Sequence, residues 1–357
     1  MSRLGSAICL VVLLGVAASL LGAGPAQPRL PESLPPNTWV DLRPGGVATG
    51  DGVGDEGWST FVYSPGLKRA IVFGKYHAAR AVSWGEDQNA LLGYDLETNR
   101  WDILEITEAA WSEFLPGVGH DQGRVAIDPR RDLYITVGNM TLHGNTMYQT
   151  YVFDLKAGRG ERMMPSGPAP WGHEIACAFA SGQGYMLCTR GASWIYEPEK
   201  NVWSEVSGSP SDRAGPGLVY DDIHGIFILF GGGSGGDETW IFDAARRAWQ
   251  RRVPPQAPPG RKGPNMAFDT GNGITLLAGG VGPDGTRLSD VWVYDAGTNV
   301  WTRLKAALPR ALGVPGGNLL TYDRDHHVLL LKESGNLALT TVWAFRYAPG
   351  RDTAGPR

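Results

Sequence analysis

Short apolar runs of four or five residues recur along most of the chain, and turn-forming residues separate each run from the next. The clearest set of runs is Gly217–Tyr220, Ile226–Phe230, Thr239–Phe242 and Ala248–Arg252. Runs of this length, bounded by Asp and Gly, are typical of β-strands. The segments between the runs are too short for helical crossovers, so the pattern predicts four antiparallel strands joined mostly by turns.

One feature of this pattern repeats: an aromatic residue in the third run is followed seven residues later by a Trp. A unit of roughly 40–50 residues with four short strands is typical of a β-propeller blade. The pairs are Tyr94 and Trp101, Tyr196 and Trp203, Phe242 and Trp249, and Tyr294 and Trp301.

The repeated unit resembles a kelch repeat, which has two glycines after its second strand and then a spaced aromatic and Trp. Phe230-Gly231-Gly232 and Ala278-Gly279-Gly280 match this pattern, whereas Phe73-Gly74 and Val137-Gly138 match half of it. The resemblance covers about residues 37–347. It implies a member of the galactose oxidase central-domain-like superfamily, of an exported bacterial type.

The last unit has no closing Trp strand, but the start of the chain supplies one. Asn37–Leu42 resembles Asn299–Leu304, so Trp39 is predicted to complete the final blade. The sequence therefore predicts an all-β, six-bladed β-propeller of kelch-like four-stranded blades, closed by the N-terminal strand. Nine Trp residues are expected to pack between blades: Trp39, Trp101, Trp194, Trp203, Trp240, Trp249, Trp292, Trp301 and Trp343.

Residues 1–26 have the pattern of a secretory signal peptide, because Arg3 precedes an apolar run and small residues follow it. A retained membrane anchor is the alternative. The predicted division is a linker at 27–36, the propeller at 37–347 and a flexible tail at 348–357. We expect a periplasmic or extracellular protein, with membrane association only if the first segment is retained.

Two cysteines, Cys177 and Cys188, flank the turn-like sequence Ser181–Gly184. A hairpin through this turn would place them opposite each other, within disulfide range. By closing this loop, a disulfide would stabilise the folded state by up to about 3 kcal/mol. The alternative is two buried free thiols.

Charge and motif content limit the function. The net charge of −4 and the absence of a Lys/Arg run give no support for nucleic-acid binding. No His spacing typical of a metal site occurs, so neither a metal nor a cofactor is expected. The copper site of galactose oxidase has no counterpart here, and its activity is rejected.

The predicted loops are longer on one face of the propeller. Residues 75–90 and 139–149 are expected to be long loops between second and third strands, while 106–119 and 163–172 connect blades. Long loops on a rigid scaffold are where binding residues usually lie. The candidate ligand-binding residues on this face are Trp58, Trp84, Trp111, Trp171, His77, Arg80, Glu86, Asp87 and His143. Alternatively, the four Trp side chains only pack loops against the sheets.

Two functions are compatible with this face. The favoured one is a non-catalytic module that binds a glycan or a protein partner. The alternative is a sugar isomerase resembling a mutarotase or epimerase, with His120, His173 and Arg213 as acid–base candidates near the channel. An exported bacterial sialic acid mutarotase shares the architecture, but its catalytic residues cannot be matched. Arg213 and Arg261 are expected mainly to bind backbone carbonyls, and His224, His326 and His327 to lie on the solvated opposite face.

Overall fold

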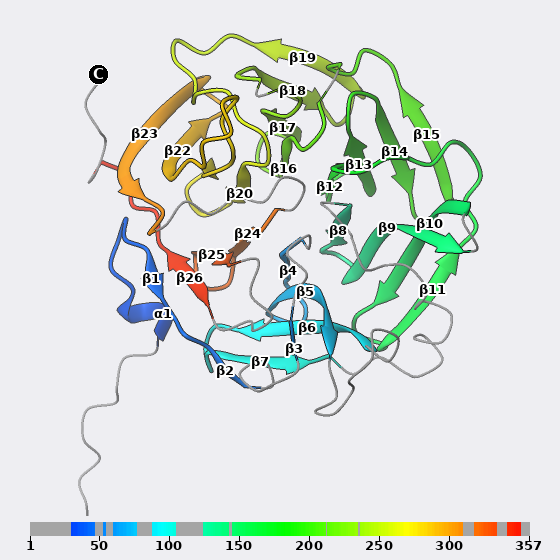
Figure 1. The fold of residues 1–357 in the computed structure, drawn as a ribbon, viewed down its shortest axis with the longest axis horizontal. Helices are drawn as coiled ribbons and strands as arrows, with labels where there is room; N and C mark the ends of the chain where they lie inside the picture. Colours follow the sequence, from blue (N-terminus) through cyan, green and yellow to red (C-terminus); the bar gives the residue numbers. More distant parts are fainter. Residues whose placement is uncertain are drawn as a thin grey trace, which may run out of the picture.

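The computed structural model describes residues 30–46, 53–54, 60–76, 88–104, 124–142, 145–211, 213–234, 236–309, 318–333 and 341–350. Six sheets, antiparallel except for one short parallel pairing in blade 1, surround a central axis, so the predicted six-bladed propeller is confirmed (Figure 1). One short helix, α1 (Leu30–Ser33), is present in these residues. In this part of the chain, no helix has the length and apolar character needed to cross a bilayer.

The first three blades follow the chain in order. Blade 1 contains β4 (Val62–Ser64), β5 (Arg69–Tyr76), β6 (Gln88–Asp95) and β7 (Arg100–Ile103), with the short strands β2 (Gly45–Gly46) and β3 (Val53–Gly54) added at β7 and β5. Blade 2 contains β8 (Val125–Asp128), β9 (Leu133–Leu142), β10 (Asn145–Asp154) and β11 (Arg159–Met163). Blade 3 contains β12 (Ala176–Ala180), β13 (Tyr185–Thr189), β14 (Ser193–Glu197) and β15 (Val202–Val206).

The remaining blades repeat this order, except that the last borrows its outer strand. Blade 4 contains β16 (Gly217–Asp221), β17 (Ile226–Phe230), β18 (Thr239–Asp243) and β19 (Ala248–Arg252). Blade 5 contains β20 (Asn265–Asp269), β21 (Ile274–Ala278), β22 (Asp290–Asp295) and β23 (Val300–Ala307). Blade 6 contains β24 (Leu320–Asp323), β25 (Val328–Lys332), β26 (Val342–Phe345) and β1 (Val40–Asp41).

The predicted closure by the N-terminal strand is also confirmed. Val40 and Asp41 pair with Ala344 and Trp343 across the β1–β26 ladder. Residues 30–36, expected to be a linker, contribute to this closure because Leu34 is buried in the cluster between blades 6 and 1. Ala348, expected to lie in a flexible tail, exchanges two hydrogen bonds with the Asn37 side chain.

Among the residues that the structure describes, the hydrophobic core forms six clusters, one between each pair of adjacent blades. Strand periodicity explains this division, because neighbouring residues of a strand point to opposite faces of the sheet. In β5, Ala70 and Val72 face blade 6, while Ile71 faces blade 2. Trp101, Trp203 and Trp301 are buried at these interfaces, as the repeat predicts.

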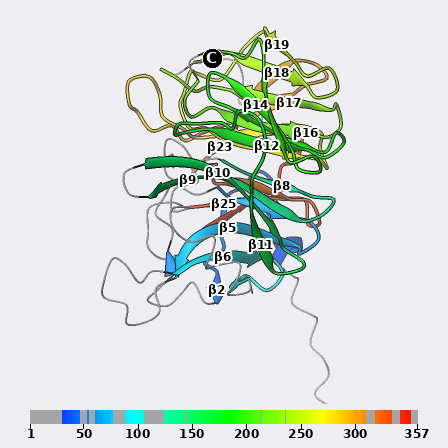
Figure 2. The same cartoon turned by 90° about the vertical axis from the view of Figure 1, so that its right-hand side faces the viewer.

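The prediction of a long loop at residues 139–149 is wrong, because most of this segment belongs to two paired strands. β9 continues to Leu142 and β10 begins at Asn145, with Thr141 paired to Thr146 near the tip. The segment contains Thr141, Thr146 and Tyr148, which are residue types that favour strands, so the ladder extends. Figure 2 shows β9 and β10 reaching beyond the neighbouring strands on one side.

Candidate functional site on the loop-rich face

The two faces of the propeller carry different connections. The loop-rich face is defined here by the connections between blades and between second and third strands, including 164–175, 231–238 and 279–289. The short-turn face carries the other turns, including 222–225 and 324–327. The candidate residues described by the structure lie on the loop-rich face.

The connection from blade 2 to blade 3 first runs along the outer edge of blade 3. Ser166 accepts a hydrogen bond from the Trp203 amide at 2.8 Å, and the Ser166 amide donates to the Asn201 carbonyl at 3.2 Å. Gly167 has a φ of 87°, and a Cβ there would lie 2.0 Å from the Trp203 carbonyl oxygen. Only glycine fits this close approach, so the connection is held firmly before it turns towards the channel.

Trp171 follows this anchored stretch and is 61% exposed. Its neighbour Gly172 lies against Arg190, because a Cβ at Gly172 would be 3.1 Å from Arg190 Nη1. His173 is exposed as well. The connection thus carries an exposed indole and an exposed imidazole, and the Arg190 guanidinium of blade 3 lies beside the glycine between them.

His173 also contacts the buried Arg124 of blade 2. Arg124 Nη2 lies 3.4 Å from His173 Nδ1. Because a guanidinium only donates, Nδ1 accepts this hydrogen bond and the ring carries a proton on Nε2. The edge of His173 available to a ligand is therefore a donor.

Glu174 links this region to the two following blades. Its carboxylate lies 2.8 Å from Lys262 Nζ of blade 5, and its carbonyl accepts a hydrogen bond from the Gly215 amide of blade 4. The Gly215 carbonyl in turn accepts from the Gly263 amide at 2.8 Å. Blades 3, 4 and 5 are thus connected beside the channel, which makes the base of the site rigid.

Arg213 is held by groups of its own blade. Its Nη1 donates to the Gly231 carbonyl at 3.2 Å, and its Nη2 pairs with Glu238. Glu238 also accepts from Trp240 Nε1 at 3.1 Å. Burial favours the neutral acid, but the Trp240 hydrogen bond and the charges of Arg213 and Arg251 keep the pKa of Glu238 below its ordinary value.

Blade 5 repeats this arrangement with Arg261. The guanidinium donates to the Gly279 carbonyl at 2.9 Å and to both oxygens of Asp290 at 2.6 and 2.8 Å. Trp292 Nε1 donates to Asp290 at 2.7 Å. The arginines are therefore part of the blade structure, as expected. Sequence reasoning missed the acids, although both Glu238 and Asp290 precede a third-strand Trp by two residues.

The structure places some of the predicted site residues and not others. Trp171, His173 and Arg213 are described, and Trp171 and His173 lie two residues apart in the same connection. In β12 and β13, Cys177 and Cys188 pair across the ladder and form a disulfide with a Cα–Cα distance of 4.2 Å. Outside the described residues lie Trp58, Trp84, Trp111, His77, Arg80, Glu86, Asp87, His120 and His143.

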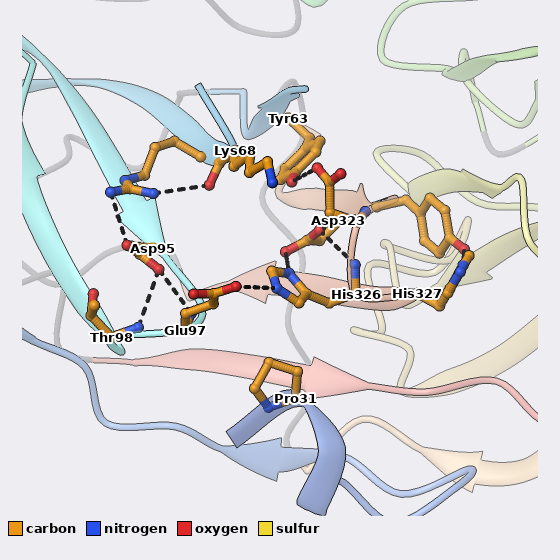
Figure 3. A network of polar contacts seen from close by, with 12 residues as sticks. Pro31, Tyr63, Lys68, Asp95, Glu97, Thr98, Asp323, His326 and His327 are labelled. Carbon is orange, nitrogen blue, oxygen red and sulfur yellow. Dashed lines mark hydrogen bonds and ion pairs between the residues drawn. The ribbon is translucent and has the colours of Figure 1, made fainter. Parts of the chain in front are cut away.

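On the short-turn face, His326 is less exposed to solvent than expected. His326 Nδ1 lies 2.7 Å from Asp323, its Nε2 lies 3.2 Å from Glu97, and its side chain is only 17% exposed (Figure 3). Glu97 belongs to blade 1 and His326 to blade 6, so the contact crosses the seam where the ring closes. The expectation of a solvated His326 is wrong because a turn of the next blade covers it.

Comparison with known families agrees with this architecture. The kelch motif matches residues 264–306, which run from the start of blade 5 through most of β23. No curated protein matches the chain. The motif match in blade 5 and the six four-stranded blades together support a kelch-repeat β-propeller, a class that commonly serves as a protein-binding module.

The chemistry available on the loop-rich face is that of recognition. Across the residues described by the structure, no group of three or more His, Cys, Asp and Glu side chains could hold a metal ion. Trp171 offers a flat apolar surface, and His173 and Arg190 offer donors.

Proposed function

We propose that the protein is a non-catalytic binding module whose loop-rich face binds a glycan or a protein partner. The observation that carries this proposal is the 61% exposure of Trp171 beside His173. The blade-closing Trp101, Trp203 and Trp301 are at most 1% exposed. A large indole that the fold leaves in solvent is suited to an interface, where Trp often contributes strongly to binding.

Binding is better supported than sugar isomerisation. Among the described candidates, Arg213 is engaged by Glu238 and the Gly231 carbonyl, so its donors point into the blade. His173 uses Nδ1 to accept from Arg124. An isomerase needs a positioned acid–base pair, whereas recognition needs only the donors and the apolar surface of this face.

We further propose that the chain is exported, with residues 1–26 acting as a signal peptide. The disulfide between Cys177 and Cys188 supports this location, because such bonds persist mainly in oxidising compartments. The mass of the mature protein purified from its native source would test the proposal. A chain that starts at Met1 would contradict cleavage.

Binding can be tested with Trp171→Ala and, as a control, Val253→Ala. Val253 is 78% exposed but follows the outer strand β19, so it tests for general loss of exposed apolar surface. The wild-type protein is screened on a glycan array, and partner proteins are captured by photo-crosslinking from position 171 in extracts of the producing cells.

The expected result is one specific ligand whose affinity falls by about tenfold or more in Trp171→Ala and is unchanged in Val253→Ala. The array and the crosslinking distinguish a glycan from a protein partner. Equal affinity in Trp171→Ala and wild type would contradict a site at Trp171, and no ligand in either experiment would contradict the binding module.

A further inference from the structure

Blades 4 and 5 bind a buried guanidinium in the same way. In each blade the arginine stands four residues before the first strand and donates to the carbonyl of the first glycine after the second strand. A carboxylate two residues before the third-strand Trp then neutralises its charge. The arginines are Arg213 and Arg261, and their acids are Glu238 and Asp290.

Contacts between blades show which residues of blade 3 correspond to these positions. The Gly215 amide donates to the Glu174 carbonyl, and the Gly263 amide donates to the Gly215 carbonyl, so these three residues are equivalent. Two residues before Glu174, Gly172 therefore stands at the arginine position of blade 3. The residue that follows β13 is Arg190, which stands where blades 4 and 5 have their first glycine. In blade 3 the arginine and the glycine have exchanged positions.

This exchange keeps a guanidinium between the same two backbone positions. A Cβ at Gly172 would lie 3.1 Å from Nη1 and 3.3 Å from Cζ of Arg190. The Nε of Arg190 is buried and has no hydrogen-bond partner among the residues that the structure describes. Arg190 as a whole is half-buried, whereas Arg213 is 8% exposed and Arg261 is fully buried. A ligand can therefore reach the guanidinium of blade 3.

The neutralising carboxylate has no counterpart in blade 3. Ala192 stands two residues before Trp194, at the position of the acid in blades 4 and 5. Its side chain offers no acceptor to a guanidinium or to Trp194 Nε1, whereas the corresponding indoles of blades 4 and 5 donate to the acids. The acid of the adjoining connection, Glu174, is bound to Lys262 at 2.8 Å. A partly buried cation in this setting favours a carboxylate from outside the chain.

The loop that carries Arg190 is short and firmly held. It comprises residues 190–192, whereas the corresponding loops of blades 4 and 5 run from 231 to 238 and from 279 to 289. The Ala192 carbonyl accepts hydrogen bonds from the Arg190 amide at 2.9 Å and from the Thr189 hydroxyl at 3.2 Å. Just below, the disulfide between Cys177 and Cys188 joins β12 to β13. The guanidinium therefore has a rigid base, which lowers the entropy lost when a ligand binds.

The groups near Arg190 are suited to a protein surface. The connection that leads to β12 exposes Met164 at 75% and Trp171 at 61%. Trp, Met and Arg are enriched in protein interfaces. A sugar would need acceptors for its hydroxyls as well as donors, whereas Arg190 and His173 Nε2 only donate. A carboxylate beside an apolar group matches this surface better.

We propose that the partner of the loop-rich face is a protein, and that an Asp or Glu side chain of this protein binds Arg190 beside Trp171. The inference rests on the binding function proposed above and names the chemistry that the site selects. The partner's carboxylate takes the role that Glu238 and Asp290 have in blades 4 and 5. A planar guanidinium can hold such a carboxylate through two parallel hydrogen bonds.

The test uses a phage-displayed library of random peptides, selected on the full chain and counter-selected on Trp171→Ala. The best peptide is synthesised, and each of its Asp and Glu residues is replaced in turn by the amide. Arg190→Gln removes the guanidinium. Arg246→Gln is the matched control, because Arg246 is exposed in a turn on the short-turn face. Circular dichroism identifies the variants that fold.

Two further variants change the charge around Arg190 without removing it. Ala192→Glu gives blade 3 the acid that blades 4 and 5 have, so the chain itself should occupy the guanidinium. Ala192→Gln adds a side chain of the same size without the charge. The affinity of the peptide should fall further in Ala192→Glu than in Ala192→Gln, and equal losses would overturn the proposal.

We expect the selected peptides to contain an acidic residue, and the affinity of the best one to fall by about tenfold or more in Arg190→Gln. One acid-to-amide change in the peptide should weaken binding to wild type by a similar factor and cause no further loss in Arg190→Gln. Arg246→Gln should bind as wild type.

The failure of this inference can be distinguished from the failure of the binding function. Peptides that require Trp171 but bind Arg190→Gln with wild-type affinity would overturn the inference and leave the binding module standing. A glycan that requires Trp171, together with no peptide that does, would also overturn only the inference. No ligand of either kind that requires Trp171 would overturn both.

Discussion

The indole N–H groups of three closing Trp residues each reach a hydroxyl on the preceding blade. Trp203 donates to Thr150 at 2.8 Å, and Trp301 donates to Thr239 at 2.9 Å. Trp249 donates to Ser193 in the same way. These hydrogen bonds supplement the apolar packing and fix the orientation of each of these blades relative to the preceding blade.

The residue type at this third-strand position also explains why two other closing Trp residues lack such a hydrogen bond. The positions that correspond to Thr239 in blades 5 and 6 are Val291 and Val342, which pack in the same clusters as Trp39 and Trp101. Neither of these two indoles has a hydrogen-bond partner among the described residues. A single residue in the third strand therefore decides whether the closing Trp of the next blade is paired.

We predict that Thr150→Val destabilises the protein by about 1–3 kcal/mol, because the buried N–H of Trp203 loses its acceptor. Thr136→Val is the matched control in the same blade. The Thr136 side chain is fully buried, and its hydroxyl has no partner among the described residues. Urea unfolding should show no loss for this control, since Val removes only an unpaired hydroxyl. Equal destabilisation by both changes would contradict this role of the Trp203 hydrogen bond.

At the scale of elements, short-range patterns predicted the strands well. Predicted and observed bounds coincide for Ile226–Phe230 and Ala248–Arg252, because alternation and the flanking turns are local signals. The error at 139–149 has a physical origin. A polar β-hairpin that projects beyond the sheet lacks the apolar runs by which strands were recognised, although Thr146 and Tyr148 are compatible with a strand.

Contacts between turns of different blades could not be predicted. The turn after β24 follows a local rule, because Asp323 accepts hydrogen bonds from the amides of Asp325 and His326. The same Asp also binds the His326 ring. Glu97, however, comes from the turn after β6, on the other side of the ring closure. Only the assembled ring brings these two turns together.

We predict that His326 makes stability depend on pH. Burial alone would lower the pKa of His326, but its hydrogen bonds and charge interactions with Asp323 and Glu97 outweigh burial and raise it above the ordinary value. The protonated ring therefore binds its partners better in the folded state. This contribution is fully present below the ordinary pKa of about 6.5 and is lost as the pH rises through the raised folded value.

The measurement is urea unfolding from about pH 6 to pH 9, compared between wild type and His326→Gln. Wild type should lose more stability than the variant over this range. His224→Gln is the matched control. His224 makes the same contact within its own turn, to Asp221 at 2.7 Å, whereas His326 also contacts Glu97 of the next blade. A pH dependence that is identical in wild type and His326→Gln would contradict the prediction.

At the scale of the whole molecule, the candidate site was found by subtraction. The repeat assigned nine Trp residues to the fold and left Trp58, Trp84, Trp111 and Trp171 without a structural role. Trp171 is exposed in the structure, while the other three lie outside the described residues. The cavity on the propeller axis, which the innermost strand of each blade lines, was not anticipated, because it depends on which residues of six separate strands lie at the same level.

Closure of the ring joins the two ends of the propeller. β1 supplies the fourth strand of blade 6, and Trp39 and Leu42 are buried on opposite sides of that blade. Leu34 adds a further buried contact from the segment before β1. The Asn37 amide donates to the Arg346 carbonyl at 2.8 Å, which extends the pairing towards the end of the chain.

Two truncations should distinguish the contribution of the closing strand to stability from that of the residues before Leu30. A chain that starts at Leu30 retains every closing contact named above, so its urea midpoint should equal that of the mature protein. A chain that starts at Pro44 loses Leu34, Trp39 and Leu42 and exposes the edge of β26. Loss of a buried Leu or Trp side chain typically costs about 2–5 kcal/mol, so the sum rivals the whole stability of a domain. We expect the shorter chain to aggregate in size-exclusion chromatography through its free edge. A monomeric, cooperatively unfolding chain from Pro44 would show that the ring does not depend on β1.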